Sequence, residues 1–195
     1  RRVLFRSVSA VGLVPDQVNL VNADGTQMPF ETDHFDVVTS FETLEHLHQR
    51  QLFLREIRRV LKPGGRLILS TPNALYTKPE NGVPSNPFHI FEYTPQELRT
   101  ELESVFEVER MVGQCLDSRI RISPFFEDQQ RLPSDFKTQS MLLGWRVVNK
   151  LPVMARERLS HAVWGEGFYP TESDYKFTED SIGHAPVTVA ICRKS

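Results

Sequence analysis

The sequence has few cysteines, no long apolar run and almost no net charge, and each absence excludes a class of protein. Its two cysteines, Cys115 and Cys192, form no CxxC pair, so we expect reduced thiols in a cytoplasmic protein. No stretch of 18 apolar residues is available to span a membrane, and the start shows no signal-peptide pattern. A formal net charge of -2 over 195 residues gives no strong attraction to nucleic acid.

The first seven residues, Arg1–Ser7, read like one frame of a common short-read sequencing adapter. We therefore interpret residues 1–7 as a library artefact in a gene that continues upstream, and leave them out of the fold prediction. The alternative is a natural, basic, amphipathic start.

Strand and helix patterns alternate through the first two thirds of the chain. Strands are predicted at 17–23, 35–40, 66–70 and 106–112, and helices at 43–61 and from Thr94 onward. Lys62–Gly65 ends the first helix, and Thr94, Pro95 and Glu97 open the second with a capping box. This alternation predicts an α/β sheet with crossover connections.

The pattern breaks between residues 114 and 180, where prolines separate two helical stretches at 138–150 and 153–163. We expect this segment to be a helical insertion packed over one edge of the sheet. Residues 186–192 then form a last strand.

Four segments, in this order and spacing, resemble the class I S-adenosylmethionine-dependent methyltransferases, in particular the type 11 and ubiquinone-biosynthesis-like members. They are Ala23–Phe30, Phe35–Ser40, Glu42–Leu47 and Val60–Asn73. The resemblance implies a partial Rossmann-like sheet whose first two strands and glycine-rich loop are missing. On this basis residues 8–113 are the C-terminal part of the core, 114–180 the insertion that caps the acceptor, and 181–195 the final core strand.

The sequence departs from the family in one respect. No acidic-x-Gly-x-Gly-x-Gly loop occurs, and Gly64–Gly65 precedes a strand instead of joining a strand to a helix. We explain the absence by where the chain begins, and expect the chain by itself to bind cofactor weakly or not at all.

The resemblance implies that S-adenosylmethionine contacts residues that follow two strands. Asp24 and Gly25 correspond to the position that holds the adenine, and Ser40, Phe41 and Glu42 to the methionine end. Each has a plainer alternative, since Asp24 can simply shape a turn and Phe41 can pack in the core.

Two histidines are candidates for removing a proton from an acceptor hydroxyl, because histidine titrates near neutral pH. His46 opens the first helix and His89 precedes the capping box. The resemblance implies that Asn73, Glu92 and Tyr93 line the acceptor pocket. The alternative for each histidine is a local hydrogen bond that holds the loop.

No metal site is expected. His46 and His48 lie two residues apart on the predicted helix and face different ways, and the chain has no HExxH pattern.

The resemblance implies methyl transfer from S-adenosylmethionine to a small-molecule or glycan-type acceptor. The alternative is a non-catalytic Rossmann-like binding or scaffold protein; a nicotinamide-dependent enzyme fits the motifs poorly. The basic region 145–158 could lie on a membrane surface, although an amphipathic helix covering the core is the favoured interpretation.

Overall fold

The computed structural model describes residues 2–4, 19–116, 136, 139–140, 143–144, 147, 150–165, 172–180 and 182–195. The strands are β1 (Arg2–Leu4), β2 (Asn19–Val21), β3 (Phe35–Phe41), β4 (Leu61–Pro72), β5 (Glu107–Leu116), β6 (Tyr175–Thr178) and β7 (Val187–Arg193). The helices are α1 (Arg50–Val60), α2 (Ala74–Thr77), α3 (Pro95–Glu103) and α6 (Val153–Trp164), with 3₁₀ turns η2 (Leu44–His46), η3 (Glu172–Asp174) and η4 (Ile182–His184).

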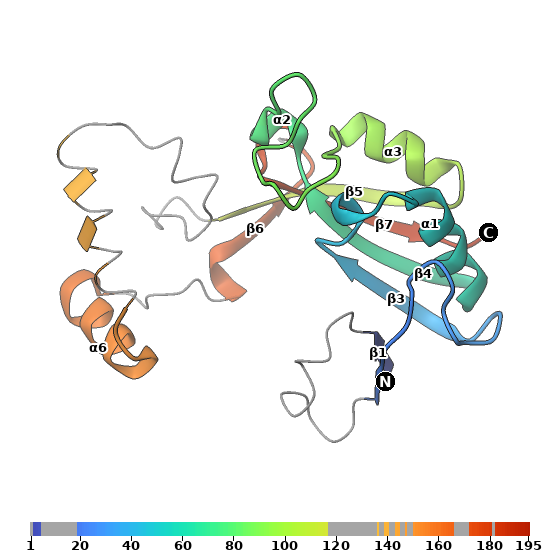
Figure 1. The fold of residues 1–195 in the computed structure, drawn as a ribbon, viewed down its shortest axis with the longest axis horizontal. Coiled ribbons are helices and arrows are strands. Elements are labelled where there is room, and N and C mark those ends of the chain that lie inside the picture. The colour runs from blue at the N-terminus through green and yellow to red at the C-terminus, as the bar shows by residue number, and fades with distance from the viewer. Residues whose placement is uncertain are drawn as a thin grey trace.

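Five strands form one mixed sheet in the order β3-β4-β7-β5-β6 (Figure 1). β3 and β4 run parallel, joined by the crossover through α1, whereas β7 is antiparallel to both β4 and β5. The predicted last strand therefore lies in the middle of the described sheet. β3 forms one edge of the described sheet.

One face of the sheet carries the hydrophobic core. Leu67 and Leu69 of β4 are fully buried and belong to one core cluster with residues of α1 and α3; α1 packs on β4 and α3 on β5. Figure 1 shows these elements. α1 presents Leu54 and Ile57 to this core at helical spacing. The opposite face is less covered among the described residues, since Val37 of β3 is 51% exposed.

The start of the first helix differs from the prediction, whereas the start of α3 agrees with it. The helix predicted from residue 43 begins at Arg50, because Leu44–His46 forms a separate 3₁₀ turn and Leu47 has extended backbone with φ -103° and ψ 130°. Glu45 and His46 thus belong to a short turn beside β4, and His48 lies between two elements. The predicted cap of α3 is confirmed: Thr94 accepts from Glu97 N while the Glu97 side chain accepts from Thr94 N.

Asp36 lies at the amino end of β3. Its Oδ1 accepts from Lys62 Nζ at 2.7 Å, and this contact lowers the pKa of the Asp36 carboxyl. The pair joins the starts of two neighbouring parallel strands.

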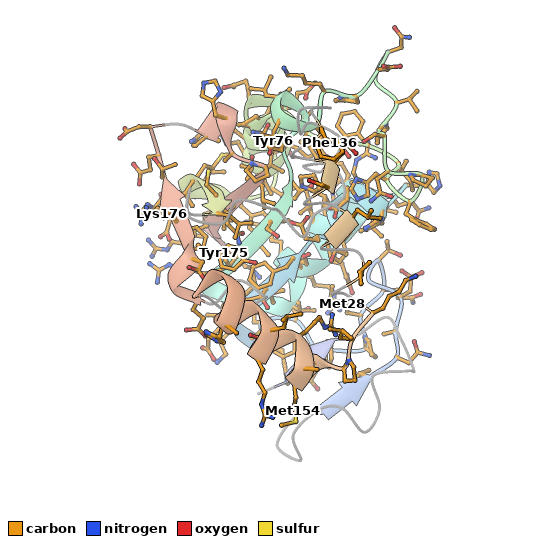
Figure 2. All side chains as sticks on the ribbon, turned by 90° about the vertical axis from the view of Figure 1, so that its left-hand side faces the viewer. Met28, Tyr76, Phe136, Met154, Tyr175 and Lys176 are labelled. Carbon is orange, nitrogen blue, oxygen red and sulfur yellow. The ribbon has the colours of Figure 1, made fainter. Side chains whose placement is uncertain are left out.

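About half of the predicted insertion lies outside the described residues, as does most of the helix predicted at 138–150. The helix predicted at 153–163 is present as α6, but it does not cover the core: Met154, labelled in Figure 2, is 71% exposed. A strand was not predicted here, yet β6 extends the sheet edge beside β5.

Within the described part of the chain, no helix combines the length and the apolar character that a transmembrane span requires.

Residues 2–4 form β1, which pairs with β2 in a separate two-stranded parallel sheet.

Candidate functional site

The carboxyl ends of β3 and β4 meet at one edge because the two strands are parallel. Glu42 N donates to the Ser70 carbonyl at 3.1 Å, and Ser70 Oγ donates to Glu42 Oε1 at 2.6 Å. Glu42 has left-handed backbone with φ 46°, a conformation that non-glycine residues seldom adopt. The two strand ends are therefore held together by a specific, strained junction.

The Glu42 carboxyl turns inward against Ser70 although the residue as a whole is exposed. Loss of hydration raises the pKa of this carboxyl, the Ser70 hydrogen bond opposes that shift, and the negative charge of Glu45 adds to it. Two carboxylates thus share this edge.

Ser40 and Phe41, two of the predicted cofactor contacts, lie beside Glu42 and differ in exposure. Ser40 Oγ is buried and has no hydrogen-bond partner, whereas the Phe41 side chain is 57% exposed. A buried hydroxyl without a partner is uncommon in folded proteins. The strand end thus offers one free polar atom and one free aromatic ring.

Asp24 and Gly25 form the turn that the plainer alternative proposed. Asp24 Oδ1 accepts from Thr26 N and from Thr26 Oγ1, both at 2.8 Å. A Cβ at Gly25 would lie 2.9 Å from the Phe53 ring, so this position needs glycine for close packing on α1. Contact of Asp24 and Gly25 with adenine remains a prediction.

His46 is oriented by the backbone of a distant loop. Its Nδ1 lies 2.7 Å from the Phe88 carbonyl oxygen, which only accepts hydrogen bonds, so Nδ1 carries the proton. In the neutral imidazole the lone pair is then on Nε2.

His89 is oriented in the same way by a carboxylate. Its Nδ1 lies 2.6 Å from Glu92 Oε1, and Glu92 Oε2 accepts a hydrogen bond from Thr77 Oγ1. Asn86 Nδ2 stands 2.9 Å from His89 Nε2. Glu92 is only 4% exposed, so it acts here as the partner of His89, and its predicted contact with an acceptor remains a prediction.

The two candidate histidines, predicted separately, lie side by side. The ring centroids of His46 and His89 are 4.9 Å apart, at an interplanar angle of 74°. The loop that carries His89 docks on the 3₁₀ turn, because Ile90 N and Phe91 N both donate to the Glu45 carbonyl oxygen. Backbone hydrogen bonds therefore fix the histidine pair.

Glu45 belongs to the same cluster and was not predicted as a site residue. It is fully buried, and its Oε2 accepts from Thr71 Oγ1 at 3.1 Å while its Oε1 has no hydrogen-bond partner. Burial raises the pKa of this carboxyl. The available signal was the spacing Glu42-x-x-Glu45-His46, which places two acids and a histidine directly after a strand.

Asn73 and Tyr93, predicted to bind the acceptor, are buried. Asn73 Nδ2 donates to the carbonyl oxygens of Ile182 and Ala185, both at 2.8 Å, and its Oδ1 accepts from Leu75 N at 3.0 Å. The Asn73 side chain therefore holds neighbouring backbone.

Tyr93 packs edge-to-face on Phe91, and burial raises the pKa of its hydroxyl to about 12. Together with Arg50, both rings line a surface cavity of about 500 Å³. The acceptor roles of Asn73 and Tyr93 remain predictions.

Comparison with known proteins gives one consistent family. Residues 6–69 match the family model described as "Methyltransferase domain". A "Probable S-adenosylmethionine-dependent methyltransferase" of Mycolicibacterium smegmatis is 38% identical over 98 residues, which are 50% of this chain and 38% of that protein. The ubiquinone/menaquinone biosynthesis C-methyltransferase UbiE of Azotobacter vinelandii is 39% identical over 70 residues, 36% of this chain and 26% of that protein. The chain thus spans well under half the length of these relatives.

Solved structures show the same fold. An S-adenosylmethionine-dependent methyltransferase from Mesorhizobium loti superimposes with a TM-score of 0.51 at 14% identity, covering 98% of this chain and 79% of that one. The MccD protein superimposes with a TM-score of 0.57 at 16% identity, covering 100% of this chain and 79% of that one.

The residues at the strand ends fit one part of the cofactor that these relatives' names specify. The exposed Phe41 ring would meet the apolar part of its methionine end, whereas the unpartnered Ser40 hydroxyl is buried and would have to be uncovered to meet a polar part. The described residues include no glycine-rich loop between a strand and a helix that could hold the rest.

Proposed function

Since the chain belongs to the class I S-adenosylmethionine-dependent methyltransferases, we propose that the protein transfers a methyl group from S-adenosylmethionine to a hydroxyl of a small-molecule or glycan-type acceptor. The cofactor supplies the reactive sulfonium methyl, so the chain has to bind, align and exclude water. The observation that carries the proposal is the His46–His89 pair at the edge where β3 and β4 end.

Ser40, Phe41 and Glu42 would hold the methionine end of the cofactor. His46 is the better placed of the two histidines to meet an acceptor, since its side chain is 34% exposed and that of His89 8%. With Nδ1 bound to the Phe88 carbonyl, the His46 Nε2 lone pair is available for a proton of the acceptor hydroxyl. The near-neutral charge of the whole chain favours a small acceptor over a nucleic acid.

The acceptor class is tested with the full-length protein and S-adenosylmethionine labelled on its methyl group. Three probes are offered separately: a catechol, a methyl glycoside and a short RNA. We expect label on the catechol or the glycoside and none on the RNA.

His46→Gln is expected to slow the transfer by roughly 100-fold or more, the usual contribution of a general base.

His48→Gln is the matched control, because His48 is exposed and lies outside the cluster. We expect it to transfer at the wild-type rate. Label on the RNA alone, or equal rates for His46→Gln and wild type, would contradict the proposal.

A further inference from the structure

Three potential ligand atoms converge beside the β3–β4 edge. One atom each from Glu45, His46 and His89 lies within 4.8 Å of the other two. Two imidazoles and one carboxylate are a donor set that Zn²⁺ and other first-row divalent ions bind in proteins.

Hydrogen bonds from Nδ1 fix the orientation of both histidine rings. Both histidines use Nδ1 for a hydrogen bond to a fixed acceptor, the Phe88 carbonyl for His46 and the Glu92 carboxylate for His89. Metal-binding histidines in proteins have the same arrangement, since the outer acceptor fixes the ring and leaves Nε2 for the ion. Thr71 does the equivalent for Glu45 by donating to Oε2.

Glu45 gives a second line of evidence for a bound ion, because one of its buried carboxyl oxygens has no partner. Its side chain is 0% exposed, and its Oε1 has no hydrogen-bond partner. The His46 Nε2 atom stands 3.6 Å away, beyond hydrogen-bond reach. Two ligand atoms about 2.1 Å from a tetrahedral ion stand roughly 3.4 Å apart, so this separation suits a shared cation.

The local charge points the same way. The Glu42 carboxyl lies close enough to interact electrostatically with Glu45 and with both histidines, so two carboxyl groups face this cluster. A dication held between these groups would stabilise the ionised form of both carboxyls.

We propose that Glu45, His46 and His89 bind one divalent transition-metal ion, with Zn²⁺ or Mn²⁺ as the probes. The Asn86 amide, now beside His89 Nε2, turns away when the ion binds. Three protein ligands leave a position open for a hydroxyl of the acceptor. With the ion bound, His46 Nε2 would be a ligand and would not act as the general base of the proposed function. Coordination would lower the pKa of the acceptor hydroxyl, whose proton would pass to water.

Metal binding is measured without S-adenosylmethionine, so its failure is distinguishable from failure of the proposed methyl transfer. The purified chain, stripped with a chelator and free of any polyhistidine tag, is titrated with ZnCl₂ and with MnCl₂ by calorimetry. We expect one ion per chain for at least one of the two metals. His46→Gln and His89→Gln should each weaken binding at least ~100-fold, and Glu92→Gln by roughly 10- to 100-fold through the outer shell.

Two further variants separate a metal site from general binding to surface histidines. His48→Gln should bind as wild type does, and Asn86→Ala should bind equally well or more tightly because it removes the amide that the ion displaces. Circular dichroism verifies the fold of each variant, and the partly exposed position of His46 makes His46→Gln less prone to unfold than His89→Gln or Glu92→Gln.

Co²⁺ gives a second readout. Ligation by Glu45, His46 and His89 should produce visible absorption bands that are lost in His46→Gln and kept in His48→Gln. Absence of one-site binding by the folded chain for both metals, or equal affinity of wild type and His46→Gln, would overturn the proposal.

Discussion

Replacing Asn73 by alanine is expected to lower the free energy of unfolding by about 3 kcal/mol. The change leaves the carbonyl oxygens of Ile182 and Ala185 without the donor that both now share, and removes the cap that Asn73 Oδ1 gives to Leu75 N. Each buried, unsatisfied polar group costs about 1–3 kcal/mol, and a lost helix cap about 1 kcal/mol. Urea unfolding followed by circular dichroism measures the difference.

Asn22→Ala is the control for this prediction, since Asn22 is exposed. We expect its effect to stay within about 0.5 kcal/mol, as for most surface substitutions. Equal stability of the two variants would show that the hydrogen bonds from Asn73 to residues 182–185 contribute nothing.

Replacing Gly113 by alanine is expected to cost about 3 kcal/mol, the upper part of the usual range for overpacking. A Cβ at this position would lie 2.5 Å from Ala185 Cβ and 3.1 Å from Ile182 Cα. Because one of these atoms is backbone, β5 and the η4 turn have to separate to make room. Thermal unfolding should show a correspondingly lower Tm.

Gly183→Ala is the matched control on the opposing segment. Its Cβ would meet Leu75 Cδ1 at 3.5 Å, an ordinary contact, and Gly183 has no positive φ. We expect Gly183→Ala to unfold near the wild-type temperature. If Gly113→Ala unfolds at the same temperature as Gly183→Ala, β5 and η4 do not pack as closely as described.

Local patterns predicted local structure well. Thr94 and Glu97 specify the start of α3 through contacts three residues apart, and the structure contains both. The β-branched residues in 35–40 likewise predicted β3, because such side chains fit the pleated backbone of a strand.

Long-range contacts account for what the sequence did not predict. Leu44–His46 has helical composition, but the loop at Ile90 and Phe91 donates to the Glu45 carbonyl oxygen and holds this turn apart from α1. β6 was missed because its four residues gain their strand partners only from β5.

The contact between the two histidines is also long-range and could not be predicted from the sequence. His46 and His89 were each predicted as a proton acceptor, and their spacing of 43 residues carries no sign of contact. Glu45 was overlooked since a glutamate beside a histidine at a helix start is ordinary for an exposed position. Only the fold buries it next to Thr71.

The central claim is that the edge where β3 ends receives S-adenosylmethionine. Calorimetric titration of the full-length protein with this cofactor tests it, with Phe41→Ala as the variant and Val83→Ala, an exposed apolar side chain on another loop, as the control. We predict one cofactor per chain, unchanged affinity for Val83→Ala, and affinity lower by about tenfold or more for Phe41→Ala, since covering an aromatic ring stabilises by roughly 1.5–3 kcal/mol. No binding by the folded protein, or equal affinity of Phe41→Ala and wild type, would contradict the claim.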